Sequence, residues 1–269
     1  MRFLLNRFQR YLAEIAFALR VGASLKDKFA LVFWTLAFHA KLGKEQTLEA
    51  SVRVGELTPH LRMRAGGGDL FVFYEMLMDD VYGVPPHLLT RKPEFILDLG
   101  ANVGLAALAF AAHFPQAKIV CVEPHPETAA LLRHNLACLG DRAGVVEAAV
   151  SGEPGTMRLN LAAGHYNASL VRRSDAGVEV RTTTVEQVMT ETGMTRIDIL
   201  KMDIEGAERL VLTPQPEWLK TVGFLTIELH DGYGFIELAR DVATAGLIVE
   251  AVGGAQAIAH RKSGRLTER

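Results

Sequence analysis

A chain of 269 residues, of which 49% are hydrophobic, is long enough to form one large α/β domain with an added N-terminal segment. Its 29 basic and 31 acidic residues give a formal charge of −2, so the chain lacks the overall positive field that attracts nucleic acid, and we expect no nucleic-acid partner. Neither of its two cysteines has metal-ligand spacing, which argues against a cysteine-based metal site.

Residues 1–42 differ from the rest of the chain in charge. Seven lysines and arginines oppose two acidic residues here, which gives this segment a charge of +5 and leaves −7 for the remainder. Apolar residues between Leu4 and Leu19 recur at helical spacing, and residues 29–40 form a second apolar run. Both runs are shorter than the ~18 to 20 residues that span a bilayer, and charges interrupt any signal-peptide core.

These features predict an N-terminal helical segment, residues 1–50, in a cytoplasmic protein. Three alternatives for this segment stay open. It packs on its own domain, it forms the interface of a homo-oligomer, or residues 1–42 contact the inner face of a membrane through their basic charge.

The next stretch carries a turn and a polar elbow. Residues 57–73 read as two short strands around the three glycines at residues 66–68, which predicts a β-hairpin that caps the main sheet. Residues 79–86 are an elbow that contains two prolines. They form either a plain linker or a lid whose Tyr82 faces a bound ligand.

A short apolar strand, residues 95–97, ends at the acid Asp98. A sharp turn at Gly100 follows, and a second glycine, Gly104, precedes an apolar helix. In an open parallel sheet the ligand crevice lies outside the carboxyl ends of the strands, and glycines let the backbone approach the ligand closely. The order D-x-G-x-N-x-G differs from the G-x-G-x-x-G fingerprint of nicotinamide and flavin sites, since Asn102 replaces a glycine that would press on a pyrophosphate. A nicotinamide-dependent oxidoreductase is therefore a weak alternative.

A second β-α unit follows this motif. Residues 117–122 form an apolar strand that ends at Glu123, about 20 residues past the last motif glycine, where Rossmann-like sites place a ribose-binding carboxylate. Pro124 shapes the following loop. We expect a helix over residues 127–139 and a third strand over residues 145–150.

Beyond the third strand the pattern changes to short alternating pieces at residues 157–161, 169–171 and 178–182, separated by glycine-bearing turns. They predict a β-rich insertion between the third and fourth strands of the sheet.

Two further apolar strands deliver ionisable side chains to their carboxyl ends. One leads to Asp203, and Glu205 and Glu208 are expected in the first turn of the next helix, where the macrodipole favours negative charge. The other leads to His230. The carboxyl ends of parallel strands meet at one edge of a sheet. The side chains expected together at that edge are Asp98, Glu123, Asp203 and His230.

The stretches Asp98–Gly104, Glu123–Pro124 and Leu200–Glu208 resemble the motifs of the FkbM family of S-adenosylmethionine-dependent methyltransferases, and the likeness covers about residues 70–255. Its most specific part is the string K-x-D-x-E-G-x-E. The resemblance implies a Rossmann-like class I methyltransferase sheet of seven strands with helices on both faces, within a domain of residues 51–269. It also implies S-adenosyl-L-methionine as methyl donor and O-methyl transfer to a hydroxyl of a sugar, glycolipid or secondary metabolite.

Methyl transfer from a sulfonium is an in-line displacement that needs no metal, so we expect none. An alcohol is a poor nucleophile, so a base must take its proton as the bond forms. His230 is best matched to that role, and Asp203 either orients it or is itself the base. Glu205 is expected to bind acceptor hydroxyls. The expected cofactor-binding residues are Tyr82, Asp98, Gly100, Ala101, Asn102, Gly104, Glu123, Pro124 and Asp203.

A non-catalytic S-adenosylmethionine-binding or scaffold protein is the other alternative. Retention of Asp203, Glu205 and His230 argues against it, because a protein that only binds the cofactor has no need of an acid-base group at the acceptor side.

Overall fold

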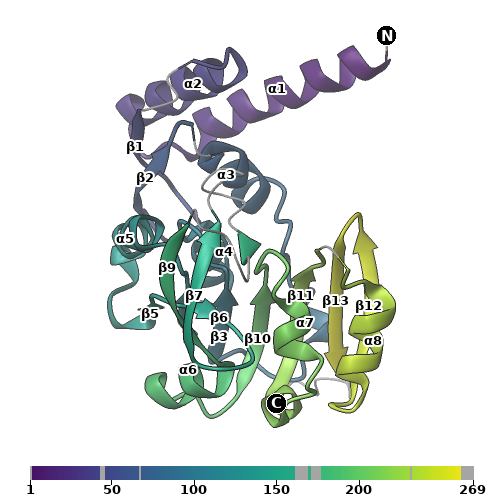
Figure 1. Ribbon diagram of the computed structural model, residues 1–269. Coiled ribbons are helices and arrows are strands. Elements are labelled where there is room, and N and C mark those ends of the chain that lie inside the picture. The colour runs from purple at the N-terminus through teal and green to yellow at the C-terminus, as the bar shows by residue number, and fades with distance from the viewer. Residues whose placement is uncertain are drawn as a thin grey trace.

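A seven-stranded sheet forms the centre of the fold (Figure 1). The computed structural model describes residues 2–42, 46–66, 68–160, 169–170, 177–230 and 232–261. Five neighbouring strands run parallel to one another. The two C-terminal strands extend the sheet at one side, and every pairing that they make is antiparallel. In spatial order the strands are β12 (Leu247–Gly253), β13 (Gln256–Arg261), β11 (Val222–Glu228), β10 (Ile197–Met202), β3 (Phe95–Leu99), β4 (Lys118–Val122) and β5 (Ala143–Val146). The predicted Rossmann-like α/β sheet is confirmed.

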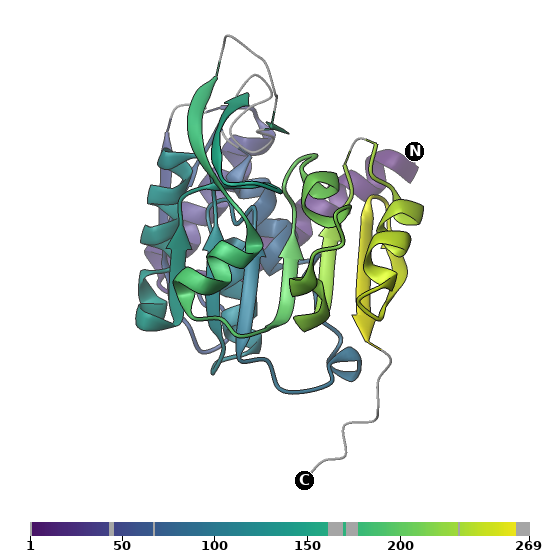
Figure 2. The same cartoon turned by 60° about the horizontal axis from the view of Figure 1, so that its bottom comes forward.

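Helices cover both faces of this sheet, as predicted (Figure 2). Successive side chains of a strand point to opposite faces, so neighbours enter different cores. On β3, Ile96 belongs to a core with α4 (Leu105–His113) and α5 (Pro126–Asn135). Its neighbour Leu97 belongs to a second core. The helices of the second core are α6 (Val185–Thr192), α7 (Glu208–Leu212) and α8 (Phe235–Ala243).

The N-terminal segment is helical, as expected, with α1 (Arg2–Val21) and α2 (Leu25–His39) packed on each other. Phe17 and Leu31 are buried in the same core as Ile96 of the sheet. None of the described helices is long and apolar enough to cross a membrane.

A small antiparallel pair, β1 (Thr47–Ser51) and β2 (His60–Arg64), follows α2. The boundary predicted after residue 50 therefore falls inside β1 and separates most of this strand from its partner β2, and the division into residues 1–50 and 51–269 stays a prediction.

The predicted hairpin over residues 57–73 is wrong, because its second half is helical. The strand β2 ends at Arg64, and residues 69–77 form helix α3 (Asp69–Leu77). Its apolar residues at positions 70, 73, 74 and 77 have the i, i+3, i+4, i+7 spacing of a helix face, and the first three are buried. Gly68, with φ of +77°, supplies the left-handed turn that starts the helix. Gly67 lies outside the described residues.

The β-rich insertion is present as a small sheet that projects beside the main one (Figure 2). Its order is β6 (Ala149–Val150), β9 (Val178–Thr183), β7 (Gly155–Asn160) and β8 (Ser169–Leu170). The single strand expected over residues 145–150 is in fact two, since β5 belongs to the main sheet and β6 to the small one. Residues 161 and 171, expected in strands, lie outside the described residues.

The helix expected over residues 127–139 is shorter than predicted. The α-helix α5 ends at Asn135, and a 3-10 helix, Ala137–Arg142, continues the chain.

Candidate active site

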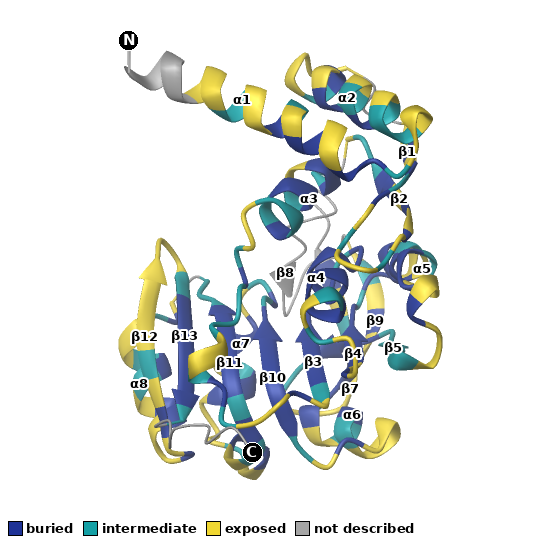
Figure 3. Ribbon diagram, turned by 180° about the vertical axis from the view of Figure 1, so that it is seen from behind, coloured by how far each residue is buried: buried dark blue, intermediate teal, exposed yellow. Residues whose placement is uncertain are grey.

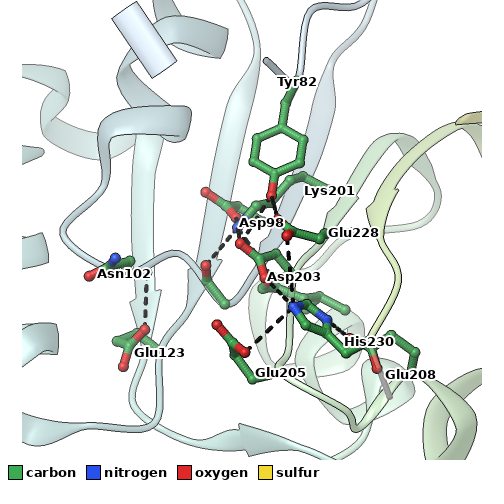
Figure 4. Close-up of polar contacts among 12 residues, drawn as sticks. Tyr82, Asp98, Asn102, Glu123, Lys201, Asp203, Glu205, Glu208, Glu228 and His230 are labelled. Atoms are coloured by element: carbon green, nitrogen blue, oxygen red, sulfur yellow. Dashed lines mark hydrogen bonds and ion pairs between the residues drawn. The ribbon is translucent and has the colours of Figure 1, made fainter. Parts of the chain in front are cut away.

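The carboxyl ends of β3, β4, β10 and β11 meet at one edge of the sheet, and α3 lies above that edge (Figure 3). The register pairs Asp98 of β3 with Lys201 of β10. Asp203 follows β10 directly, and His230 lies two residues beyond β11. Figure 4 shows Asp203 and His230 close together, whereas Glu123 stands apart beside Asn102.

The loop after β3 is shaped by residues with left-handed backbone. Gly100 has φ of +75°, and a Cβ there would lie 1.7 Å from the carbonyl oxygen of Asp203, which only glycine avoids. Gly104 has φ of +90°, and a Cβ there would lie 2.7 Å from Leu132. Asn102, at φ of +50°, adopts the same region without being glycine. The loop therefore packs its backbone directly on the loop that follows β10.

Glu123 holds this loop from the neighbouring strand. One carboxylate oxygen accepts a hydrogen bond from the N–H of Asn102 at 3.0 Å, and the other accepts one from the N–H of His125 at 2.9 Å. Burial raises the pKa of Glu123 to about 7, although the two backbone donors lower it. Ala101 is buried at the base of the loop, and Pro124, which is half-buried, turns the chain after Glu123.

Lys201 is a central cation that the sequence analysis named only as part of a motif. Its side chain is 3% exposed, and Nζ lies 3.1 Å from Oδ1 of Asp98 and 2.6 Å from the carbonyl oxygen of Gly100. Burial lowers the pKa of Lys201, but the charges of Asp98 and Asp203 outweigh burial and raise it. The sequence does contain a signal for the role of Lys201. It lies in a strand whose other residues, apart from Asp198, are apolar, and a charged side chain buried in such a strand must be paired.

Tyr82 reaches from the elbow of residues 79–86 to two carboxylates. Its hydroxyl oxygen lies 3.0 Å from Oδ2 of Asp203 and 3.1 Å from Oε2 of Glu228. Since a phenol has one proton, it donates to one of them at a time. Burial and these two negative charges raise the pKa of Tyr82, so the hydroxyl stays protonated. Glu228 was not among the predicted site residues. It is the last residue of β11, so it lies at the same carboxyl edge of the sheet as Asp203 and could have been predicted on that ground.

His230 lies in a ring of carboxylates (Figure 4). Its Nδ1 is 2.8 Å from Oε1 of Glu208, which is fully buried. Its Nε2 faces Glu205 at 3.5 Å, Asp203 at 3.8 Å and Glu228 at 4.0 Å. The expectation that both glutamates sit in a first helical turn holds only for Glu208, which starts α7. Glu205 precedes that helix in a turn with φ of +52°.

The charges around His230 shift its protonation and that of Glu205. Burial lowers the pKa of His230, but the hydrogen bond and charge of Glu208, with two further carboxylates, outweigh burial and raise it to about 9. Burial and the nearby carboxylates raise the pKa of Glu205 to about 7, against the opposing effect of His230. At neutral pH His230 is therefore charged in the ligand-free protein, and Glu205 is partly protonated.

Two cavities meet at these carboxylates. One of about 530 Å³ lies between α3 and the loop of residues 100–106, with Asp203, Glu205 and Glu228 in its lining. The other, of about 790 Å³, lies beside α8 and includes His230. Glu205 and Glu228 line both. The arrangement can hold one ligand on each side, with titratable groups between them.

The same groups have the donor set of a cation site. Among the described residues, ligand atoms of Asp203, Glu228 and His230 lie within 4.8 Å of one another. The expectation that the reaction uses no metal stays a prediction.

The comparisons with known proteins match the region that carries these residues. The family model of the methyltransferase FkbM domain matches residues 98–249, which include every predicted site residue except Tyr82. The 2-O-methyltransferase NoeI of Sinorhizobium fredii is 30% identical over 162 residues, which cover 54% of this chain and 66% of that protein.

Two further relatives match more than half of the chain. Methyltransferase sdnD of Sordaria araneosa is 31% identical over 176 residues, 53% of this chain and 67% of that protein. The 31-O-demethyl-FK506 methyltransferase FkbM of Streptomyces tacrolimicus is 26% identical over 195 residues, 60% of this chain and 74% of that protein. The matches with NoeI and sdnD thus span about two thirds of the length of each relative.

Proposed function

Because the chain belongs to the FkbM family of S-adenosylmethionine-dependent methyltransferases, we propose that it transfers the methyl group to a hydroxyl oxygen of a sugar, glycolipid or secondary metabolite. The names of NoeI and of the Streptomyces FkbM enzyme describe methyl transfer to oxygen, which supports this acceptor chemistry. The observation that carries the proposal is the position of His230, whose Nε2 faces three carboxylates where two cavities meet.

We propose that the cavity of about 530 Å³ between α3 and the loop of residues 100–106 binds the cofactor, and we call it the cofactor cavity. Its charge fits a sulfonium compound. Its lining contains four carboxylates, those of Glu75, Asp203, Glu205 and Glu228, against the single cation Lys201. Lys201 is already paired with Asp98, so the cavity retains a negative charge that favours a cationic ligand. When bound, S-adenosylmethionine supplies an electrophilic methyl group on sulfur.

The residues proposed to hold the cofactor lie at the carboxyl ends of β3, β4 and β10, in the loops that follow these strands, and in the elbow of residues 79–86. The backbone of the loop at Gly100 is open to close approach, and Glu123 stands at the next strand end. The proposed set is Tyr82, Asp98, Gly100, Ala101, Asn102, Gly104, Glu123, Pro124 and Asp203.

His230 is the proposed general base, with Asp203 as its partner or its substitute. Glu208 occupies Nδ1, so Nε2 is the nitrogen that can accept a proton from the acceptor hydroxyl. The raised pKa means that His230 must first lose a proton to act, which a positive charge bound in the adjacent cavity would favour. Glu205, which lines both cavities, is proposed to accept hydrogen bonds from other acceptor hydroxyls.

The experiment is methyl transfer from isotope-labelled S-adenosylmethionine to fractionated small molecules, glycans and lipids, followed by mass spectrometry for an added CH₂. Label on oxygen is the expected result, and label on nitrogen or carbon would overturn the acceptor chemistry. Cofactor binding without transfer in any fraction would favour the scaffold alternative. The nicotinamide-dependent alternative is removed by family membership.

We also propose that residues 1–50 form an accessory segment beside a methyltransferase domain of residues 51–269, and that residues 1–42 contact a membrane face at its periphery. The charge of +5 over residues 1–42 supports the contact. Packing of this segment against a second copy of the chain, in a homo-oligomer, is the competing arrangement.

A further inference from the structure

Large apolar side chains are concentrated on α1 and α2. In the described part of the chain thirteen large hydrophobic residues are exposed, and eight of them lie between residues 8 and 42, so the apolar surface is localised on this segment. They are Phe8, Leu12, Leu19, Leu25, Phe29, Phe33, Leu36 and Leu42. Leu25, Phe29 and Phe33 recur every fourth residue of α2 and form an exposed apolar stripe along it. Figure 3 shows exposed residues along both helices, beyond the carboxyl edge of the sheet.

The charges beside this surface are positive, because its two acids are engaged within the protein. Glu14 is 6% exposed and accepts a hydrogen bond from Nε of Arg10 at 2.8 Å. Asp27 accepts hydrogen bonds from backbone and side-chain donors at the start of α2. Lys26 and Lys41, near the two ends of α2, are exposed. An apolar stripe flanked by lysines suits an anionic bilayer surface.

A cavity of about 490 Å³ lies between α1, α3 and α4, away from the catalytic cluster. Phe17 and Met76 belong to its apolar wall. Arg20 and Arg53 lie at its exposed rim, and no ion pair joins either guanidinium to a carboxylate of the described residues. Arg53 donates a hydrogen bond of 2.7 Å to the carbonyl oxygen of Ala23, in the turn between α1 and α2. The basic rim therefore adjoins the start of the apolar stripe.

The remaining polar groups of this cavity leave it cationic. His113 is exposed at its edge, and Asp80 is the one carboxylate among its lining residues. The Asp80 carboxylate is directed toward its own turn, since a Cβ on Gly83 would lie 2.8 Å from its Oδ2. Two arginines with an apolar wall behind them are suited to a phosphate that carries an apolar chain, because a guanidinium binds phosphate oxygens in pairs.

We infer that this cavity binds the phosphate headgroup of an anionic phospholipid, while the apolar stripe of α2 enters the bilayer surface beside it. The inference rests on the proposed membrane contact of residues 1–42 and specifies its ligand. Met76 lines both this cavity and the cofactor cavity, so helix α3 lies between the headgroup and the methyl-transfer site. Docking in this way favours a glycolipid among the proposed acceptors, since its sugar would lie at the same surface.

The test is co-sedimentation of the full chain with vesicles of phosphatidylcholine alone and of phosphatidylcholine mixed with phosphatidylglycerol. We expect binding only to the mixed vesicles, weakened by salt. The double variant Arg20→Gln/Arg53→Gln should bind roughly 25-fold more weakly, at about fivefold for each charge. Phe29→Glu, at a position that is 69% exposed, should also lose binding.

Two control variants match these changes elsewhere on the surface. Arg91→Gln/Lys92→Gln removes two exposed charges before β3, and Ile236→Glu changes an apolar residue of α8 that is 81% exposed. Both should bind like the unchanged chain, and all variants should keep their affinity for S-adenosylhomocysteine, which reports that the fold is intact.

The outcomes separate the headgroup site from the membrane contact. If the Arg20/Arg53 variant binds as well as the Arg91/Lys92 variant while Phe29→Glu does not bind, the headgroup site is wrong and the membrane contact stands. If the unchanged chain binds neither vesicle, both are wrong. A concentration-dependent dimer in analytical ultracentrifugation that Phe29→Glu dissociates would then assign the stripe to a second copy of the chain.

Discussion

The Nδ1 atom of His230 lies 2.8 Å from Oε1 of Glu208, a buried glutamate 22 residues earlier in the chain. This contact leaves Nε2 as the ring nitrogen that faces the other carboxylates, and it is a main cause of the raised pKa of His230. The pair therefore decides both where a proton can be accepted and at what pH.

The first prediction concerns this pair. If His230 is the base, kcat/KM for S-adenosylmethionine rises with pH up to about 9, the pKa of His230 in the ligand-free protein, because only the neutral ring accepts a proton. Glu208→Gln removes the negative charge that raises this pKa, so the acidic limb of the pH profile should move to lower pH. The exposed Glu217→Gln is the control and should leave the limb in place. A limb near pH 7 in the unchanged enzyme would point instead to Glu205, whose pKa is about 7.

The second prediction separates the base from its partner. His230→Ala should reduce turnover by about 10² to 10⁴ while leaving the affinity for S-adenosylhomocysteine nearly intact. The double variant with Asp203→Asn should be little slower than the slower single variant, since groups that act as a unit are not additive. Single-turnover kinetics and calorimetry measure the two quantities. Should the acidic limb persist in His230→Ala and disappear in Asp203→Asn, Asp203 is the base.

The third prediction concerns the carboxylate that holds the loop after β3. Glu123→Ala removes two charged hydrogen bonds, to the N–H groups of Asn102 and His125, and should weaken cofactor binding roughly 10- to 100-fold. Titration calorimetry with S-adenosylhomocysteine measures this. Glu127→Ala, at an exposed position in the first turn of α5, is the control. Equal affinities of the two variants would show that Glu123 has no part in the cofactor site.

The fourth prediction tests the close approach of the two loops. Gly100 and Gly206 both have positive φ, but a Cβ at Gly100 would lie 1.7 Å from a backbone oxygen, whereas nothing lies within 4 Å of one at Gly206. Gly206→Ala should therefore lose only about 1 to 2 kcal/mol of unfolding free energy through backbone strain. Gly100→Ala should lose clearly more. Chemical denaturation of both variants measures the difference, and equal losses would contradict the backbone contact.

The fifth prediction concerns metal. A displacement at a sulfonium methyl group needs no Lewis acid, so prolonged treatment with EDTA should leave turnover unchanged. The donor set of Asp203, Glu228 and His230 makes this a real test. Suppose instead that EDTA removes turnover and that added Mg²⁺ or Mn²⁺ restores it. If Glu228→Gln prevents this recovery, the three residues bind a cation.

The strand-end positions of the candidate site were readable from the sequence because they depend on short-range patterns. Asp98, Glu123, Asp203 and His230 each follow or end a short apolar run, and parallel strands bring such positions to one edge. The glycines at positions 100 and 104 could be recognised for the same reason, since a turn that requires positive φ is a local property.

Contacts between distant segments were decided by the tertiary structure alone. Tyr82 meets Asp203 across 121 residues of sequence, and no local pattern indicates that it also meets Glu228. Glu208 and Glu205 look alike as charges near a helix start, yet one is fully buried against His230 and the other lies in the turn between two cavities.

Residues 69–77 show the same limit for secondary structure. Their apolar run, set after three glycines, fits a strand as well as a helix when read locally. The choice of helix was made by packing, because only a helix presents Phe73 and Tyr74 together to Phe17 of α1 while keeping Val72 and Glu75 at the cofactor cavity. The sequence by itself thus determined the sheet and the residues at its edge, and tertiary packing decided which of them face one another, because the free energy of burial depends on partners far away in the chain.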